Sequence, residues 1–347
     1  MGKLKPLIYW EGFPVCGLIL REVIKNYPEV EIIATKPKVP FKDLEISLNK
    51  EITWLNDDFD SSYLIKKFNN KNLFIHTGWN NKEILKYGDY IRKNNNAKVY
   101  VSVDNDLRFS LRQVFGSIYF RLLLKNKFNG ALVPGIKAKK LMRFLGMNPK
   151  NIHIGLYGAY EGIFKSTKLI LDRNDEFLYV GQLTKRKSID LLVNAFEVYK
   201  ANGGKWNLRI IGSGDLVISK QIKGLSIEGF LQPYEIADRM NNAKVFVLLS
   251  KLEHWGTVVC EAAACGMQLL LTHNIGSKDD LLIDGLNGFE IFDHDIDKVV
   301  EGFEYFEKLP TSQWVNGSDV STKLSSLYNT HTYYASFKNI LIKEGLL

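Results

Sequence analysis

The sequence lacks the features of a membrane-spanning, secreted or disulfide-stabilised chain. No apolar run approaches the roughly 20 residues that a helix needs to cross a bilayer, so we expect no transmembrane span. The first ten residues run directly into a strand-like segment, without the apolar core of a signal peptide. Only three cysteines occur among the 347 residues, and their spacing is not that of a metal site. We therefore expect Cys16, Cys260 and Cys265 to be free thiols in a reducing cytosol.

Short-period repeats and low-complexity segments are also missing, which argues against a solenoid or a disordered chain. Hydrophobic residues make up 46% of the sequence and charged residues 24%, as in an ordinary soluble globular protein. A chain of 347 residues is long for one domain and sufficient for two, each with its own core.

Acidic residues are scarce in the first part of the chain. Residues 1–150 contain 26 Lys/Arg against 14 Asp/Glu, and residues 92–150 contain 13 against 2, whereas the remainder has 20 against 24. This balance favours a phosphate-bearing partner such as an anionic lipid headgroup or a phosphorylated substrate, with a solvated lysine-rich surface as the alternative. Nucleic acid is disfavoured as a partner because the basic stretch lacks an aromatic-interleaved recognition motif.

Short apolar runs alternate with helical stretches in two blocks. The expected strands are 7–10, 31–34, 73–76, 99–103 and 131–134 in the first block, and 177–180, 208–211, 245–249, 268–271 and one near Ile291 in the second. Continuous apolar strands indicate parallel sheets buried on both faces, and the alternation indicates two doubly wound α/β domains. We predict domains over 1–158 and 159–317, and a C-terminal helix within 318–347 that packs back on the first domain.

The stretch from Glu253 to Gly266 is the most informative. Between Val258 and Cys265 every residue except Glu261 is small or apolar, which predicts a helix packed closely against a sheet. A carboxylate in such a run is unfavourable unless a polar group meets it, and no cation lies three or four residues away. A hydroxyl-rich ligand is therefore a candidate partner for Glu261, and protein groups that satisfy a buried glutamate are the alternative.

Several other polar segments follow predicted strands. Gly256 precedes the helix that carries Glu261, and the first turn of this helix offers unpaired N–H groups to an anion. The segments 181–187 and 212–215 follow two neighbouring strands. Ligands of doubly wound sheets bind beyond the carboxyl ends of the strands. A basic loop and a helix start at one such edge suit a diphosphate.

This constellation resembles the retaining glycosyltransferases of family 4, and the similarity covers most of residues 176–292. It rests on the Val-Gly-x-Leu-x-x-x-Lys core within 177–192, on 208–214, on 226–230, on the Glu-x7-Glu element at 253–261 followed by Ala-x-Ala-Cys-Gly, and on Gly276 with 284–288. The resemblance implies a GT-B architecture, in which two Rossmann-like domains face a central cleft. It also implies sugar transfer with retention from a UDP- or GDP-sugar to a saccharide or lipid-linked saccharide, in bacterial surface polysaccharide synthesis such as that of capsule or O-antigen.

The resemblance assigns roles to individual residues of the second domain. Lys187 is expected to contact the donor diphosphate, Glu253 to hold the hydroxyls of the transferred sugar, and Glu261 to accept hydrogen bonds from the ribose. The other donor-side candidates are Gln182, Gly212, Gly229, Phe230, Gly256, Thr257 and Val258. The alternatives are a solvated charge for Lys187, an exposed loop position for Glu253, a helix cap for Thr257 and a core position for Phe230.

The sequence departs from the family at the diphosphate site. Gln182 stands where the family usually has arginine, which removes one of two expected cations and leaves Lys185 or Arg186 as the substitute. No cofactor is expected besides the donor, and we expect metal independence because no Asp-x-Asp pair follows a donor-site strand.

The first domain departs from the family as well. Its glycine pair is reduced to Gly12 and Gly17, and the usual histidine has no clear equivalent. Asp104 or Asp106 occupies that place, and Asp104 is the candidate for a catalytic substitute. The alternative role for both is that of helix-capping acids before 108–124. His76 is a further acceptor-side candidate, or a satisfied half-buried histidine.

The expected helix 110–128 combines apolar residues with Arg112, Arg121, Lys125 and Lys127. Its apolar residues either belong to the core or rest on an anionic membrane, which would make the protein cytoplasmic and peripheral on the inner face of the plasma membrane. Two other functions remain open: a GT-B-type sugar-nucleotide hydrolase or epimerase, and a non-catalytic sugar-nucleotide-binding subunit.

Overall fold

The computed structural model describes residues 3–37 and 39–347, without the side chains of Val15 and Cys16, so the prediction for the Cys16 thiol lies outside the described part. The chain forms two compact units. Unit 1 comprises residues 1–158 and 329–347, and unit 2 comprises residues 159–328. Cys260 and Cys265 are free and buried in unit 2, as expected. Within the described residues, no helix combines the length and the apolar character needed to cross a membrane.

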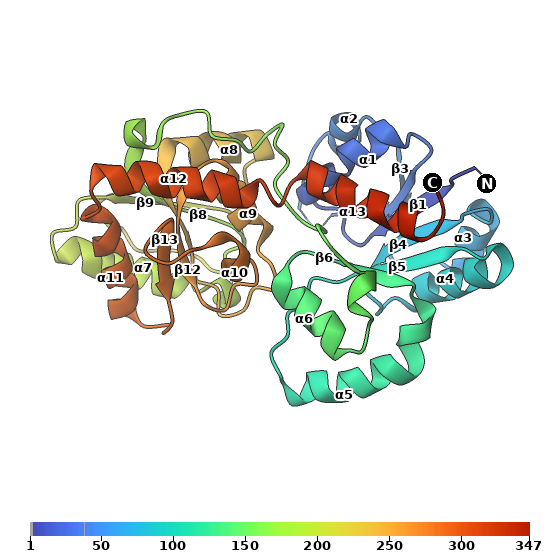
Figure 1. Ribbon diagram of the computed structural model, residues 1–347. Helices are drawn as coiled ribbons and strands as arrows, with labels where there is room; N and C mark the ends of the chain where they lie inside the picture. The colour runs from blue at the N-terminus through green and yellow to red at the C-terminus, as the bar shows by residue number, and fades with distance from the viewer. Residues whose placement is uncertain (1–2, 38) are drawn as a thin grey trace. The chain divides into compact units, whose positions relative to one another are not determined.

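Unit 1 is built on a parallel sheet with the strand order β3-β2-β1-β4-β5-β6-β7 (Figure 1). The strands are β1 (Pro6–Trp10), β2 (Glu31–Thr35), β3 (Ile52–Leu55), β4 (Leu73–Thr77), β5 (Lys98–Ser102), β6 (Gly130–Val133) and β7 (Ile152–Ile154). The helices are η1 (Val15–Leu20), α1 (Arg21–Asn26), α2 (Leu44–Leu48), α3 (Ser61–Lys67), α4 (Lys82–Asn95), α5 (Leu111–Tyr119), η2 (Phe120–Leu124), η3 (Lys125–Lys127), α6 (Ile136–Phe144), η4 (Pro149–Asn151) and α13 (Thr330–Lys343). The η labels denote 3-10 turns, except that η2 is a short π-helix that continues α5.

Unit 2 has a parallel sheet with the order β10-β9-β8-β11-β12-β13. Its strands are β8 (Asn174–Val180), β9 (Asn207–Ile211), β10 (Leu225–Glu228), β11 (Ala243–Leu248), β12 (Gln268–Thr272) and β13 (Gly288–Ile291). Its helices are η5 (Ile170–Asp172), η6 (Lys185–Lys187), α7 (Ile189–Ala201), α8 (Pro233–Asn242), α9 (Thr257–Ala264), α10 (Lys278–Leu281), α11 (Ile296–Glu307) and α12 (Thr311–Ser325). Figure 1 shows α8, α9 and α12 on one side of this sheet and α7 and α11 on the other.

Both sheets reverse their strand order beside their first strand, as Rossmann folds do. The predicted fold class of two doubly wound α/β domains is therefore confirmed. In unit 2 the reversal lies between β8 and β11, which pair in parallel. Because ligands of such sheets bind beyond the carboxyl ends of the strands at this switch point, the loops after β8 and β11 are the place to look for a site.

The segment predicted as one C-terminal helix within 318–347 forms parts of two helices. The first, α12, packs on α9 in unit 2, where the Ser318 hydroxyl donates to the carbonyl of Gly266 at 2.7 Å. The second, α13, begins after Asn329, whose side chain accepts from the amide of Thr332 at 3.1 Å. Only α13 belongs to unit 1, where it packs on α1, η1 and β7.

Candidate active site

The loop after β8 carries a buried lysine. Lys187 ends the 3-10 turn η6 and is 8% exposed, and Ser188 follows in the left-handed region at φ 55° before α7 begins. Burial lowers the pKa of Lys187, and the nearby Glu253 carboxylate opposes this shift. The solvated-charge alternative for Lys187 is therefore excluded in this structure. A buried cation of this kind requires an anionic partner.

Glu253, in the loop after β11, is that partner. Its Oε2 forms an ion pair with the Lys187 ammonium and accepts from Arg186 Nη1 at 3.0 Å. The Ser250 hydroxyl lies 3.5 Å from the same oxygen. Although 66 residues separate them, the two donor-side residues expected to act in the chemistry are thus brought together at the switch point of the sheet.

Arg186 is the second cation at this position. Besides its bond to Glu253, it donates to the carbonyl of Leu252 at 2.8 Å. Its own carbonyl accepts from the amide of Lys251 at 2.9 Å, so the two loops are bonded backbone to backbone as well. The sequence analysis left Lys185 and Arg186 open as substitutes for the missing arginine. Of the two, Arg186 is the residue with bonds to the loop after β11.

Glycines allow the loops of this edge to approach one another closely. A Cβ on Gly212, which has φ +147°, would lie 1.8 Å from the carbonyl oxygen of Gly181. A Cβ on Gly276 would lie 1.7 Å from the carbonyl oxygen of His254. Since real Cβ atoms do not come this near to a backbone oxygen, any larger residue would separate the loops after β8 and β9, or those after β11 and β12.

The helix α9 starts at this edge and carries Glu261. Gly256 precedes it with φ +84°, and no side chain caps its first turn, so Thr257 does not act as a helix cap. The amides of Thr257 and Val258 have no acceptor within the helix and lie where an anion would be bound. That this turn binds a phosphate stays a prediction.

Glu261 has no partner among the described residues. Its side chain is partly exposed, and no described group gives its carboxylate a hydrogen bond or an ion pair. Burial alone raises the pKa of Glu261 to about 7, because no cation or donor offsets the cost of desolvation. The alternative of a glutamate satisfied by protein groups therefore does not hold in this structure.

The remaining donor-side candidates line the neighbouring loops. Gln182 follows β8 with an exposed side chain, and its carbonyl accepts from the Tyr179 hydroxyl at 2.8 Å. Gly229 and the half-buried Phe230 follow β10, at the same carboxyl edge of the sheet. Phe230 is therefore not fully buried, as a residue of the core would be.

His76 lies inside unit 1. The residue lies one position before the end of β4, is 1% exposed and packs between the rings of Phe74 and Phe128 at 5.1 and 5.6 Å between centroids. Burial lowers its pKa to about 4, so the imidazole is neutral at neutral pH. The enclosed ring has no face for a saccharide, and the half-buried position expected as the alternative is in fact fully buried.

The two aspartates after β5 have different surroundings. Asp106 is buried and accepts from Arg108 Nε at 2.8 and 2.9 Å. Asp104 is half-buried and accepts from the Tyr157 hydroxyl at 3.4 Å. Neither is the N-cap of α5, because Ser110 holds that position and accepts from the amide of Gln113. The helix-capping alternative is therefore wrong, and Asp104 is the more accessible of the two.

The glycines after β1 have structural roles. Gly12 has φ +59° and donates its amide to the Thr35 hydroxyl at 2.7 Å. Gly17 lies in η1, where a Cβ would come within 2.3 Å of the Phe13 ring. Gly12 thus forms the turn after β1, and Gly17 allows η1 to pack on that turn.

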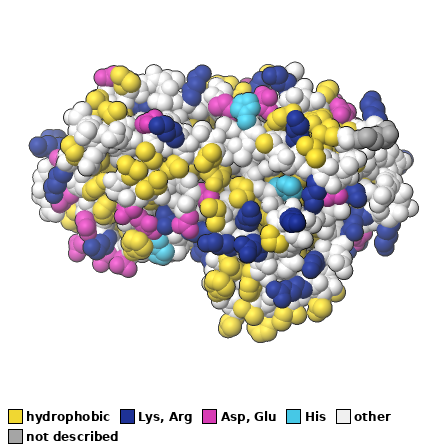
Figure 2. All heavy atoms as spheres, viewed as in Figure 1, with side chains coloured by type: hydrophobic (Ala, Val, Ile, Leu, Met, Phe, Trp, Pro, Cys, Tyr) yellow, Lys and Arg dark blue, Asp and Glu magenta, His cyan; other side chains and the backbone are white. Residues whose placement is uncertain are grey.

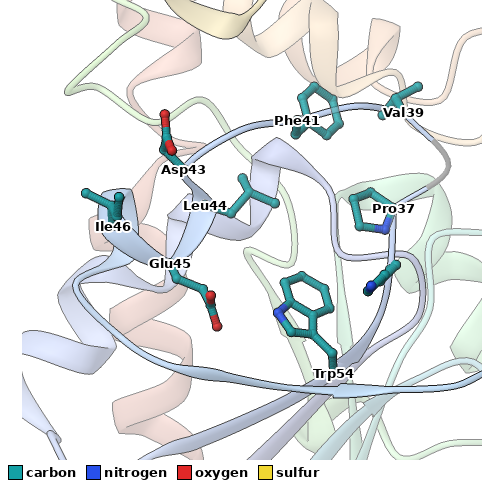
Figure 3. Close-up of a pocket in the computed structure, with 9 residues that line it drawn as sticks. Pro37, Val39, Phe41, Asp43, Leu44, Glu45, Ile46 and Trp54 are labelled. Carbon is teal, nitrogen blue, oxygen red and sulfur yellow. The ribbon is translucent and has the colours of Figure 1, made fainter.

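Two pockets are lined mainly by other residues. One in unit 1, of about 440 Å³, is lined in part by Lys36, Leu44, Glu45 and the indole of Trp54 from β3 (Figure 3). One in unit 2, of about 720 Å³, lies beside η6 and includes Ser188, Lys251 and His294. Neither was foreseen from the sequence, because each is formed by residues of elements that are separate in the chain. No group of three or more His, Cys, Asp or Glu side chains in the described part of the chain is placed to hold a metal ion.

Comparison with known proteins gives a family match within unit 2 and several curated relatives. Residues 163–316 match the sequence model of the family described as glycosyl transferases group 1. An uncharacterized glycosyltransferase of Haemophilus influenzae is 25% identical over 185 residues, which cover 52% of each chain. The capsular polysaccharide biosynthesis glycosyltransferase CapM of Staphylococcus aureus is 27% identical over 224 residues, covering 56% of this chain and 57% of CapM. The chain thus spans about half the length of the curated relatives it matches.

Solved structures match the whole chain. HepE of Anabaena, in complex with UDP and glucose, superposes with a TM-score of 0.75 at 14% identity, covering 99% of both chains. The pneumococcal O-GlcNAc transferase GtfA, in complex with UDP and GlcNAc, gives 0.73 at 10% identity and covers 99% of both chains. The chain has the GT-B fold. The lipopolysaccharide outer core galactosyltransferase WaaB gives 0.67 at 16% identity, covering 98% of this chain and 99% of WaaB.

Proposed function

We propose that the protein is a glycosyltransferase that moves a sugar from a nucleoside-diphosphate donor, bound on unit 2, to a saccharide acceptor in polysaccharide synthesis. One observation carries the proposal: Glu261 holds an unpartnered, partly exposed carboxylate on α9, among the described residues, at the edge where Lys187 and Arg186 meet Glu253. The match of residues 163–316 to glycosyl transferases group 1 and the similarity to CapM support it.

The chemistry follows from the charges at this edge. Cleavage of the bond between the anomeric carbon and the diphosphate builds negative charge on the leaving oxygen. Lys187 and the amides of Thr257 and Val258 are placed to stabilise this charge as preorganised donors. Binding of the diphosphate would give Lys187 a second anionic partner, which frees part of the Glu253 carboxylate for hydroxyl groups of the transferred sugar.

Several finer features belong to the same proposal. Uridine is the nucleoside we expect, since HepE and GtfA were both solved with UDP. Retention of configuration and metal independence are carried over from the resemblance to family 4. We expect the reaction to take place in the cytoplasm, where the buried thiols Cys260 and Cys265 remain reduced.

Nucleotide binding tests the proposal directly. A panel of UDP, GDP, ADP and CMP is added to the full chain, and the midpoint of thermal unfolding is measured. A ligand at about 100 times its dissociation constant stabilises the folded state by about 2.7 kcal/mol. We expect UDP to raise the midpoint of the wild type and to have much less effect on Glu261→Ala.

Glu301→Ala is the matched control, since Glu301 pairs with Lys298 on the exposed face of α11. A nucleotide response that is equal in all three proteins would refute the role of Glu261. Incubation of the wild type with UDP-sugars then separates the remaining functions. Free sugar or an epimerised donor without acceptor would indicate a hydrolase or epimerase, and binding without any turnover would indicate a non-catalytic subunit.

A further inference from the structure

The helix formed by α5 and η2 is attached to unit 1 through a narrow stripe. Ser117, Phe120 and Leu124 are the buried residues of this helix. The Phe120 ring stacks on Phe128 at 6.1 Å and packs edge-on against Trp79 at 5.2 Å between centroids. These anchors fix the orientation of the helix, so the residues on its opposite side face solvent.

That opposite side is apolar. Leu111, Phe115, Ile118 and Leu122 follow one another at spacings of four, three and four residues, which places them on one face of the helix. Their exposed fractions are 77%, 69%, 53% and 74%. In Figure 2, hydrophobic side chains gather along the edge of the molecule that α5 occupies in Figure 1. The expectation that these residues belong to the core is therefore wrong.

Basic residues accompany this apolar face, and the surrounding sequence lacks acidic ones. The sequence contains no acidic residue from Leu107 to Tyr160, while ten Lys and Arg residues fall in that range. Arg112 and Lys125 are exposed and have no ion pair among the described residues. Arg121 donates to the carbonyl of Phe144 at 2.7 Å and remains exposed. Long basic side chains beside an apolar stripe can reach lipid phosphates while the stripe enters the acyl region.

We propose that the α5 face, defined as Leu111, Phe115, Ile118 and Leu122 with the flanking Arg112 and Lys125, docks unit 1 on an anionic lipid bilayer. The helix lies in the plane of the headgroups with its apolar residues below them, as amphipathic surface helices do. Charge complementarity selects this occupant, because a purely apolar protein partner would not need the surrounding cations and a nucleic acid would not need the apolar stripe. The proposal stands apart from the donor site, since no residue of unit 2 takes part.

Vesicle flotation of the full chain tests the proposal. Vesicles of phosphatidylcholine alone are compared with vesicles that contain about a third of phosphatidylglycerol, at low and at moderate salt. We expect flotation with the anionic vesicles, weakened as salt screens the headgroups. Absence of flotation with anionic vesicles at low salt would overturn the proposal.

Substitutions on the face locate the contact. The double variant Leu111→Ser/Phe115→Ser should lose about tenfold in partitioning per side chain, equivalent to about 1.4 kcal/mol each. The matched control Leu169→Ser/Val217→Ser changes residues of unit 2 that are 75% and 90% exposed, and it should bind vesicles like the wild type. Both variants should keep the wild-type unfolding midpoint and UDP response, because none of these side chains is buried. The assignment to the α5 face would be refuted if both variants lost vesicle binding equally, or if neither lost it.

Two further experiments test the role of charge and the possibility of self-association. Arg112→Gln/Lys125→Gln should reduce binding to anionic vesicles by at least about fivefold and leave weak binding to neutral vesicles unchanged. The exposed pair Lys205→Gln/Lys223→Gln on unit 2 is its control. Sedimentation equilibrium without lipid should give the same mass for the wild type and for Leu111→Ser/Phe115→Ser. A dimer that this variant dissolves would instead assign the face to a second copy of the chain.

Discussion

Glu261→Gln should stabilise the ligand-free protein at pH 8 and have no effect near pH 4.5. Burial raises the pKa of Glu261 from its ordinary value of 4.5 to about 7. Between these two values the folded state holds a proton that the unfolded state has released, so stability falls as pH rises through this window. Above pH 7 the carboxylate is ionised in both states and the full cost of its burial is present.

The size of this cost follows from the pKa difference. Each pKa unit corresponds to about 1.4 kcal/mol, which gives about 3 kcal/mol as an upper limit for a carboxylate that solvent partly reaches. A glutamine side chain at this position would keep the shape of the glutamate without its charge. For a unit of this size, 1 kcal/mol moves the unfolding midpoint by about 2–4 °C, so we expect a rise of up to about 6–12 °C at pH 8.

Calorimetric scans of the full chain at pH 5, 6, 7 and 8 measure this effect. The difference between Glu261→Gln and the wild type should grow steadily with pH, whereas Glu301→Gln, on the exposed face of α11, should give a small and constant difference. A difference that does not depend on pH, or a variant less stable than the wild type at pH 8, would contradict the argument. The same variant should bind nucleotide more weakly, which links the instability of the free protein to its binding role.

Three other expectations concern the proposed donor site at the carboxyl edge of the unit 2 sheet. Lys187→Ala and Glu253→Ala should each lower sugar transfer by at least about 10²-fold while circular dichroism shows a folded chain, and near-wild-type turnover would refute their roles. Gly212→Ala should lower the free energy of unfolding by about 2–4 kcal/mol because its Cβ would lie 1.8 Å from a carbonyl oxygen, whereas Gly229→Ala, with no atom within 4 Å, should be nearly neutral in urea titrations. Transfer should persist in EDTA, and a loss that Mg²⁺ or Mn²⁺ restores would contradict metal independence.

Most of the fold could be predicted from the sequence, because buried parallel strands have continuous apolar runs. The ten expected runs all coincide with strands of the structure, and their ends agree to within one residue except at the starts of β8 and β11, which begin three and two residues earlier than expected. The strands β3 and β7 lie at the two edges of their sheet and are only four and three residues long, which gave too little pattern to detect. The C-terminal region was expected as one helix because periodicity alone does not reveal the cap at Asn329.

The site was predicted in part. The exceptional position of Glu261 in an apolar run was visible in the sequence, because hydrophobic patterning makes a lone carboxylate conspicuous. The sequence did not show that Arg186 rather than Lys185 bonds to the loop after β11, because this depends on the rotation of a three-residue turn. The sequence left the apolar face of α5 open between the core and a membrane surface, because a helical period identifies an apolar stripe without indicating what covers it.

The return of α13 to unit 1 affects the order in which the chain can fold during synthesis. Tyr333, Phe337, Ile340 and Leu341 are buried against elements from the first 154 residues. Along the sequence, residues 159–328 of unit 2 separate the two parts of unit 1. All of unit 2 therefore leaves the ribosome before the last core residues of unit 1 do. The early βα segments therefore remain incompletely covered while unit 2 is synthesised, and chaperone contact during translation should concentrate on them.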